Sequence, residues 1–267
     1  MQRLCHTRLD LPATRRYLAR MAFALPSIAA KTILPDAPGG RAARPGLQDY
    51  YNTLFRALGP QNWWPARTPF EVIVGAILTQ NTAWTNVEKA MNNLRRERLL
   101  TPAALERVPQ AKLARLIRSS GYFRQKAKKL KAFVRFLRRA YGGSLTRMFR
   151  APTAELREKL LVVHGIGPET ADSILLYAAR HPVFVVDAYT KRILSRHGLV
   201  AEKAGYEELR ALFEKTLPPD VQLYNEFHGL IVMTGKHWCR TKNPLCHACP
   251  LQKFLTAEIL ARLEPHR

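Results

Sequence analysis

The sequence predicts an all-α protein. After Pro45, apolar residues recur at intervals of three and four along most of the chain, whereas the alternating pattern of strands is almost missing. Threonine, proline and glycine stand where such helices would begin and end. A chain of 267 residues has room for one large or two smaller domains of this kind.

Individual helices can be placed from these signals. The first is expected within 47–58, and two more within 70–94 are separated by a polar break at 79–82. Thr101 is a typical N-cap for a helix that starts with Pro102, and a helix over 126–141 ends at the glycine pair 142–143. Further helices are predicted at 112–123, 153–161, 168–180, 188–198, 206–217 and 221–238, with a short extended apolar run at 182–187.

The charge of the chain points to a polyanionic partner. The sequence has 43 Lys and Arg against 20 Asp and Glu, a net charge of +23. Fourteen basic residues and no acidic residue lie between Arg107 and Arg150. A solvated helix face usually mixes both signs of charge, so this stretch favours contact with nucleic acid, and we expect double-stranded DNA.

Residues 1–45 form a separate basic extension that we expect to be disordered. They carry eight basic and two acidic residues, with scattered proline and glycine. A targeting segment, a DNA-binding arm, or an over-long start with initiation at Met21 are alternatives. No apolar run is long enough for a bilayer, so we expect no membrane partner. The protein is expected to be a monomer in the cytoplasm or nucleoid.

A glycine-rich turn joins two predicted helices in the segment HGIGPETADSI, within 160–175. Gly165 and Gly167, on either side of Ile166, allow a tight turn, and Pro168 suits the first position of the next helix. Backbone N–H groups at a helix start can bind an anion, and in a basic protein a DNA phosphate is the natural one. A plain glycine loop is the alternative.

Together, three motifs resemble the helix-hairpin-helix (HhH-GPD) DNA glycosylases of the endonuclease III superfamily. They are the hairpin LxxVHGIGPETA, the following VVDAYTKRILSRHG and the upstream AILTQNT, within a region from Leu47 to the last cysteines. The resemblance implies two helical domains with DNA and the damaged base in the cleft between them. It places the central domain at about 70–185, the second at 46–69 plus 186–238, and a cysteine loop at 239–255.

Asp187 is the predicted catalytic residue. It follows four apolar residues and precedes a helix, where an aspartate is also a common N-cap, and both roles could hold at once. Cleavage of an N-glycosidic bond develops positive charge on the sugar, which a poorly screened carboxylate stabilises. The resemblance implies the same role.

Glu169 stands where bifunctional members of the family carry a lysine that forms a Schiff base with the sugar. A carboxylate cannot form an imine, so the lyase route is expected to be closed. Lys191, one helical turn after Asp187, is the alternative amine. Glu169 also suits the first turn of a helix.

The predicted base pocket consists of Trp63, Trp64, Phe70, Trp84 and Glu169. An extruded base stacks on aromatic faces, and a cationic purine gains further from an electron-rich ring. Phe70 is equally well explained as a core residue. With TQNT and GPETAD, these tryptophans are most similar to the 3-methyladenine glycosylase branch. Gln80 matches the family position that fills the gap left by the flipped base, with a helix-end polar residue as the alternative.

Cys239, Cys246 and Cys249 have the spacing of the family's [4Fe–4S] loop, but Leu255 stands where the fourth cysteine is expected. A cluster with an unusual ligand, a zinc ion held with His237 or His247, and a loop without metal are the three alternatives.

The sequence therefore predicts a monofunctional DNA N-glycosylase of base excision repair that acts on alkylated purines. The alternatives are an endonuclease III-like glycosylase and lyase for oxidised pyrimidines, and a non-catalytic protein that binds DNA damage.

Overall fold

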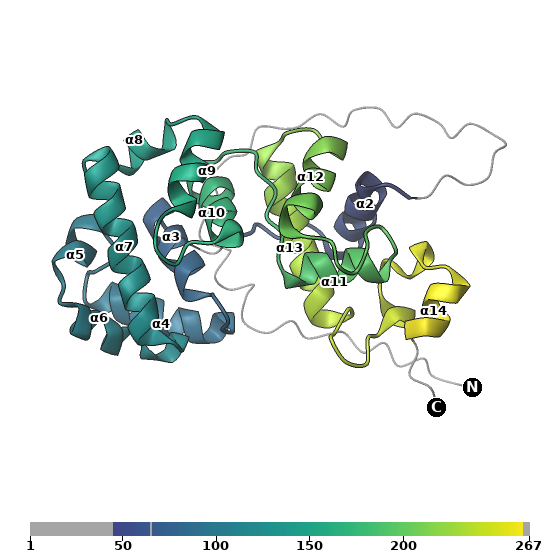
Figure 1. The fold of residues 1–267 in the computed structure, drawn as a ribbon. Helices are drawn as coiled ribbons and strands as arrows, with labels where there is room; N and C mark the ends of the chain where they lie inside the picture. The colour runs from purple at the N-terminus through teal and green to yellow at the C-terminus, as the bar shows by residue number, and fades with distance from the viewer. Residues whose placement is uncertain (1–44, 65, 264–267) are drawn as a thin grey trace. The chain divides into compact units, whose positions relative to one another are not determined.

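The computed structural model describes residues 45–64 and 66–263, and this part of the chain is helical and contains no strand (Figure 1). The predicted all-α fold is confirmed. The N-terminal extension, including Cys5 and Met21, lies outside the described residues. No helix within the described ranges combines the length and the apolar character needed to cross a bilayer.

The predicted helices begin and end close to the expected positions, except that the one expected over 168–180 is an α-helix followed by a π-helix. In chain order the helices are α2 (Leu47–Leu58), α3 (Pro69–Leu78), α4 (Trp84–Arg96), α5 (Pro102–Arg107), α6 (Gln110–Leu116), η1 (Arg118–Ser120), α7 (Phe123–Tyr141), α8 (Leu145–Phe149), α9 (Thr153–Leu161), α10 (Pro168–Ser173), the π-helix η2 (Ile174–Ala179), α11 (Ala188–Arg196), α12 (Tyr206–Thr216), α13 (Val221–His237), η3 (Cys246–Ala248), η4 (Gln252–Phe254) and α14 (Ala257–Leu263). Of these, α8, η3, η4 and α14 were not predicted.

Local capping explains several of these boundaries. Thr68 and Thr101 each accept a hydrogen bond from a backbone N–H in the first turn, and a proline follows each of them. Helix α7 ends at Gly142, whose φ of 61° lies in the left-handed region that favours glycine. The caps at Thr101 and Gly142 are short-range features, which is why the sequence predicts them; the cap at Thr68 was not predicted.

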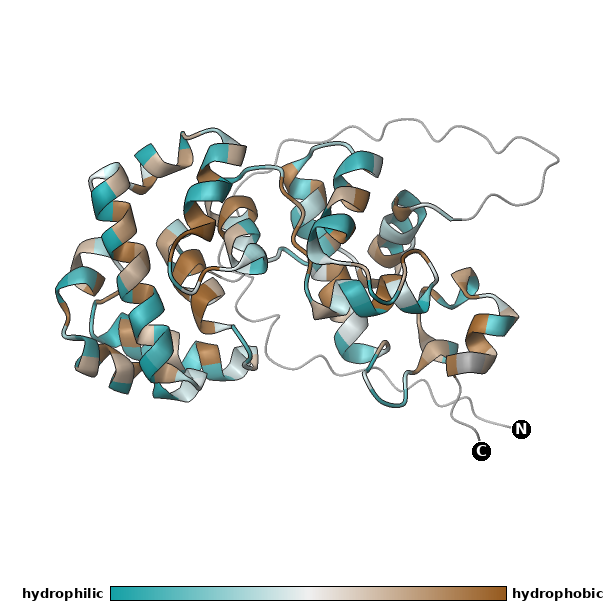
Figure 2. Cartoon of the chain, in the orientation of Figure 1, coloured by the Kyte–Doolittle hydropathy of each residue, from teal (hydrophilic) through white to brown (hydrophobic). Residues whose placement is uncertain are grey.

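The helices from α3 to η2 pack around a common core. Helix α3 contacts η2, α7, α10 and α4, and α7 also contacts α5, α6 and α8. Helix α3 is buried from Phe70 to Leu78, whereas α7 has both hydrophilic and hydrophobic residues along its length (Figure 2). The predicted apolar stripe of α7 is buried and consists of Leu130, Phe133, Val134 and Leu137.

Two lysines of α7 point into this core. Lys126 Nζ donates to the carbonyls of Leu78 (2.9 Å) and Ser120 (2.5 Å), at the ends of α3 and η1. Lys131 Nζ donates to three carbonyls at the end of α5, including that of Leu105 at 2.8 Å. Both ammonium groups therefore satisfy carbonyls that a helix end leaves unpaired, and burial lowers the pKa of Lys126 to about 8.

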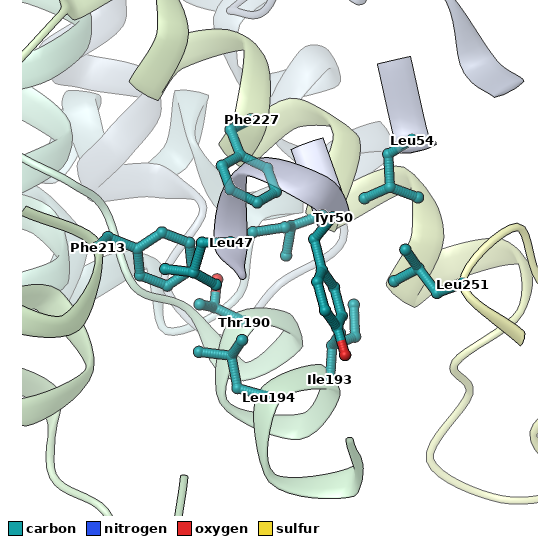
Figure 3. A pocket seen from close by; sticks show the side chains of 10 residues that line it. Leu47, Tyr50, Leu54, Thr190, Ile193, Leu194, Phe213, Phe227 and Leu251 are labelled. Atoms are coloured by element: carbon teal, nitrogen blue, oxygen red, sulfur yellow. The ribbon is translucent and has the colours of Figure 1, made fainter. Parts of the chain in front are cut away.

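Helices α2, α11 and α13 form a second group, in which α13 contacts α2, α11 and η2. The predicted extended run lies between the two groups in sequence, and its Phe184 stacks on Phe213 with the ring centroids 3.7 Å apart. Side chains of this group, together with Phe213 and Leu251, enclose a gap of about 10 Å³, shown in Figure 3, which is no larger than one water. The predicted bounds of the two domains stay a prediction.

Candidate active site

Asp187 caps helix α11 at the end of the buried extended run. Its Oδ1 accepts hydrogen bonds from the backbone N–H of Thr190 at 2.8 Å and from the Thr190 hydroxyl at 2.9 Å. The predicted N-cap role is confirmed. These hydrogen bonds fix Oδ1, and the side chain, which is 14% exposed, retains a small accessible surface.

The second oxygen of Asp187 faces a buried histidine. Nε2 of His228, on α13, lies 3.6 Å from Asp187 Oδ2, and Nδ1 lies 2.6 Å from the hydroxyl of Tyr177 in η2. Burial by itself would raise the pKa of Asp187, but His228 and the Thr190 hydrogen bonds outweigh it, and the pKa is lowered. Burial raises the pKa of Tyr177 well above its usual value, with a further contribution from Asp187.

Glu169 and Lys236 complete the charged surroundings of this carboxylate. Glu169 is exposed, yet partial desolvation by the surrounding protein, reinforced by the charge of Asp187, raises its pKa. Partial desolvation lowers the pKa of Lys236, although the negative charge of Asp187 acts in the opposite direction. The Nζ atom of Lys236 lies 5.8 Å from the centre of the Trp63 ring. Lys191, the amine considered from the sequence, is exposed.

Three of the predicted pocket aromatics form a connected cluster with Tyr177. The Trp64 ring contacts Trp84 with centroids 5.3 Å apart and Tyr177 at 5.1 Å, and Trp63 meets Trp64 edge to face at 6.2 Å. The indole N–H groups of Trp63 and Trp64 are buried; that of Trp64 has no hydrogen-bond partner among the described residues, whereas the Trp63 side chain interacts with the Tyr177 hydroxyl. Phe70 is 3% exposed and belongs to the hydrophobic core.

Two helical glycines provide the space for these indoles. A Cβ on Gly75 of α3 would lie 3.5 Å from both Trp64 and Trp84, and a Cβ on Gly229 of α13 would lie 3.0 Å from Trp63 Cβ. Buried Glu226 of α13 also accepts a hydrogen bond from the backbone of Gln61, just before the tryptophans. Helix α13 therefore positions both the tryptophan segment and His228.

The glycine hairpin is bound to the rest of the protein through Gln80. Gly165 has a φ of 83°, so it needs the left-handed conformation, whereas Gly167 has extended backbone and caps α10. Gln80 Nε2 donates to the Gly165 carbonyl at 3.0 Å and to Thr170 Oγ1 at 2.9 Å. Ile166 is buried, and its N–H donates to the Val163 carbonyl, so this amide is engaged within the hairpin.

A buried ion pair supports the two helices that carry the hairpin. Arg157 of α9 donates two hydrogen bonds to Asp172 of α10, at 2.7 and 3.0 Å. Asp172 also accepts from the Tyr206 hydroxyl of α12 at 2.8 Å, and Arg157 reaches Glu207 at 2.6 Å. These charged hydrogen bonds connect α9, α10 and α12.

A basic groove lies beside the hairpin. Arg135, Phe136 and Arg139 of α7 and Val162 and His164 of the hairpin line it, and its volume is about 260 Å³. Val162 is 83% exposed, although it is apolar. The predicted basic stretch thus contains exposed cations, of which Arg135 and Arg139 line this groove, and the two buried lysines described above, which cannot contact DNA.

The cysteine loop does not complete a four-thiolate site within the described residues. Burial, and the neighbouring thiols Cys239 and Cys246 to a lesser extent, raise the pKa of Cys249 to about 11. Nη1 of Arg196 lies 3.3 Å from Cys239 Sγ. No group of three or more His, Cys, Asp or Glu in the described ranges is arranged to hold a metal. The choice among cluster, zinc and no metal stays a prediction, which the iron and zinc content of the purified protein checks.

Sequence reasoning did not identify Tyr177, His228 and Lys236 as site residues. His228 follows Glu226 in a helix that is otherwise largely apolar, and buried polar side chains in such a helix are a usable signal. Tyr177 lies in an apolar run where a tyrosine is unremarkable. The π-helical turn at this position is a more specific indicator, because such turns often occur at functional sites.

Comparison with known proteins finds relatives across most of the chain. A family model described as HhH-GPD superfamily base excision DNA repair protein matches residues 74–219. A proposed DNA repair glycosylase of Methanocaldococcus jannaschii is 50% identical over 206 residues, which cover 76% of this chain and 93% of that protein. Endonuclease III of Thermotoga maritima is 35% identical over 184 residues, which cover 69% of this chain and 81% of the enzyme.

Solved structures agree with these relatives. A 3-methyladenine DNA glycosylase of H. pylori bound to 1,N6-ethenoadenine superimposes with a TM-score of 0.61 at 32% identity, over 71% of this chain and 95% of that chain. Endonuclease III in a trapped covalent complex with DNA has a TM-score of 0.70 over 82% of this chain and 97% of that chain. At 23% identity, the second comparison shows the shared fold.

Proposed function

We propose, from the premise that this chain belongs to the HhH-GPD superfamily of base excision DNA repair proteins, that it is a monofunctional glycosylase for alkylated purines. As a member of this superfamily the chain is a DNA glycosylase that acts in base excision repair and binds DNA. The substrate class and the absence of lyase activity are the proposed part.

The observation that carries the proposal is an ionised, desolvated carboxylate beside a cluster of tryptophans. Asp187 has a lowered pKa and a small accessible surface, so its negative charge is available at neutral pH and little screened. Departure of the base leaves oxocarbenium-like charge on the sugar, which Asp187 would stabilise while water attacks.

The aromatic cluster supports a purine substrate. A flipped base needs aromatic faces to stack on, and Trp63, Trp64 and Trp84 provide them close to Tyr177. A cationic alkylpurine is attracted by an indole face and is also a good leaving group, so stacking and one carboxylate can suffice. The H. pylori relative binds a modified adenine in its solved structure.

Glu169 supports hydrolysis without strand cleavage. It occupies the first turn of α10, where a lysine would be needed for a Schiff base, and a carboxylate cannot form one. The expected product is an intact strand with an abasic site.

A base-release screen over duplexes with alkylated purines, oxidised pyrimidines or no lesion tests the proposal. We expect release of alkylated purine and an at least 100-fold loss in Asp187→Asn, whose duplex affinity stays close to that of the parent. Release of oxidised pyrimidines with strand cleavage would instead support an endonuclease III-like activity. Binding without any release would indicate a protein that recognises damage without catalysis.

A further inference from the structure

Two buried polar side chains lie behind Asp187 and end on its carboxylate. Tyr177 Oη and His228 Nδ1 are 2.6 Å apart, and His228 Nε2 is 3.6 Å from Asp187 Oδ2. Nε2 has no hydrogen-bond partner within 3.5 Å in the described part of the chain, although its atom surface is buried. A buried polar nitrogen without a partner is rare, and here the carboxylate of Asp187 lies 3.6 Å from it.

The proton positions follow from the chemistry of the three groups. Tyr177 keeps its proton, because burial and Asp187 oppose the phenolate, so its hydroxyl can donate to Nδ1. A neutral imidazole that accepts at Nδ1 carries its proton on Nε2. The Nε2–H then faces Asp187 Oδ2, while Thr190 donates to Oδ1.

We propose that His228 is a positioning residue for the catalytic carboxylate, and that Tyr177 sets the tautomer in which His228 does this. The inference rests on the proposed function of Asp187. With Thr190 donating to Oδ1 and the Nε2–H of His228 directed at Oδ2 from 3.6 Å, the carboxylate is favoured in one orientation and in its ionised form.

Other titratable groups near His228 and Asp187 lie on the neighbouring helices. Glu169 of α10 interacts electrostatically with both His228 and Asp187, and Lys236 of α13 with Asp187. On the α2 side, the Tyr51 ring packs on Phe227, and on the α11 side, the Tyr189 ring packs on Gly235. Tyr177 and Asp187 are the groups that lie against the ring nitrogens of His228, at 2.6 Å from Nδ1 and 3.6 Å from Nε2.

Two amide substitutions of His228 distinguish the roles of its two ring nitrogens. In His228→Gln the amide nitrogen reaches the place of Nε2, so a donor to Asp187 is retained. In His228→Asn the amide overlaps Nδ1, so the contact with Tyr177 is retained and that with Asp187 is lost. We expect single-turnover base release to fall about 10- to 100-fold in His228→Asn and much less in His228→Gln.

The rate–pH profile distinguishes positioning from a merely structural role. Release requires ionised Asp187, so the rate falls as the pH drops through its pKa. A donor lowers that pKa, and its loss in His228→Asn moves the acid limb of the profile to higher pH, whereas His228→Gln stays nearer to the parent. Tyr177→Phe is expected to move the acid limb to higher pH as well, but by a smaller amount than His228→Asn.

Tyr50→Phe is the matched control. Tyr50 and His197 form another tyrosine–histidine pair, with Oη and Nδ1 3.0 Å apart, and burial lowers the pKa of His197 to about 4. Removing this hydroxyl deletes the same kind of bond without touching Asp187, so rate and acid limb should match those of the parent. Thermal unfolding of each variant reports whether it is folded.

Imidazole ¹⁵N shifts of the unmodified protein check the tautomer without any substitution, and we expect the proton of His228 on Nε2. A proton on Nδ1, or superimposable rate–pH profiles of His228→Asn and the parent, would overturn the inference about His228 but not the proposed function. An active Asp187→Asn, or a parent protein that releases no modified base, would overturn the proposed function and the inference with it.

Discussion

Removing the arginine of the buried Arg157–Asp172 pair should cost a large part of the stability of the hairpin region. The Asp172 side chain is 0% exposed and that of Arg157 is 14% exposed. In Arg157→Met the aliphatic volume is kept, but a buried carboxylate loses two hydrogen bonds and its counter-charge. Breaking such a pair costs about 3–5 kcal/mol, and for a domain of this size each kcal/mol lowers Tm by roughly 2–4 °C.

We therefore expect the Tm of Arg157→Met to fall by about 6–20 °C at pH 7.5, measured by circular dichroism. Burial already raises the pKa of Asp172, and loss of Arg157 would raise it further. A carboxyl with a raised pKa destabilises the fold above that pKa, so the deficit against the parent should shrink as the pH is lowered.

Arg157→Met/Asp172→Asn is the control, because a neutral amide still accepts from Tyr206 and leaves no buried charge. It should recover part of the lost stability at pH 7.5. A Tm of Arg157→Met within about 2 °C of the parent, or a deficit independent of pH, would refute the reasoning.

Three further predictions concern DNA and the site. Duplex affinity should fall steeply with salt, and Arg135→Gln/Arg139→Gln should reduce the slope of log K against log salt by about 2, measured by fluorescence anisotropy; an unchanged slope would place the DNA elsewhere. Borohydride during turnover should trap no protein–DNA adduct in the parent, since Glu169 cannot form an imine. A trapped adduct on a denaturing gel would mean that an amine such as Lys191 acts as a nucleophile. Gly229→Val should displace the Trp63 side chain, because even a Cβ would lie 3.0 Å from Trp63 Cβ and 3.3 Å from its ring atom Cγ, and should weaken base release more than duplex binding; equal loss of both would contradict a local effect.

Local chemistry explains what could be predicted from the sequence. Thr101 before Pro102, and Gly142 after an apolar stripe, specify helix ends through contacts within four residues. The same holds for Asp187, whose N-cap partner Thr190 is three residues away. Such short-range signals were sufficient for the all-α fold, the hairpin and the candidate carboxylate.

The surroundings of that carboxylate depend on long-range contacts. Tyr177 and His228 are 51 residues apart in sequence, and Gln80 lies 85 residues from the glycine that it holds. Neither local propensity nor spacing encodes such pairs, because they form only when separate helices pack.

The exposure of the basic side chains is the clearest example of a property that only the tertiary structure decided. In the sequence, the residues of the basic stretch cannot be told apart by their surroundings. In the structure, Lys126 and Lys131 point inward and donate to helix carbonyls, whereas Arg135 and Arg139 line an exposed groove. The sequence by itself determined that this segment is cationic and helical. Which cations can meet a phosphate was decided by the helix face that packing buries, since a buried ammonium group is held by carbonyls and is shielded from any external partner.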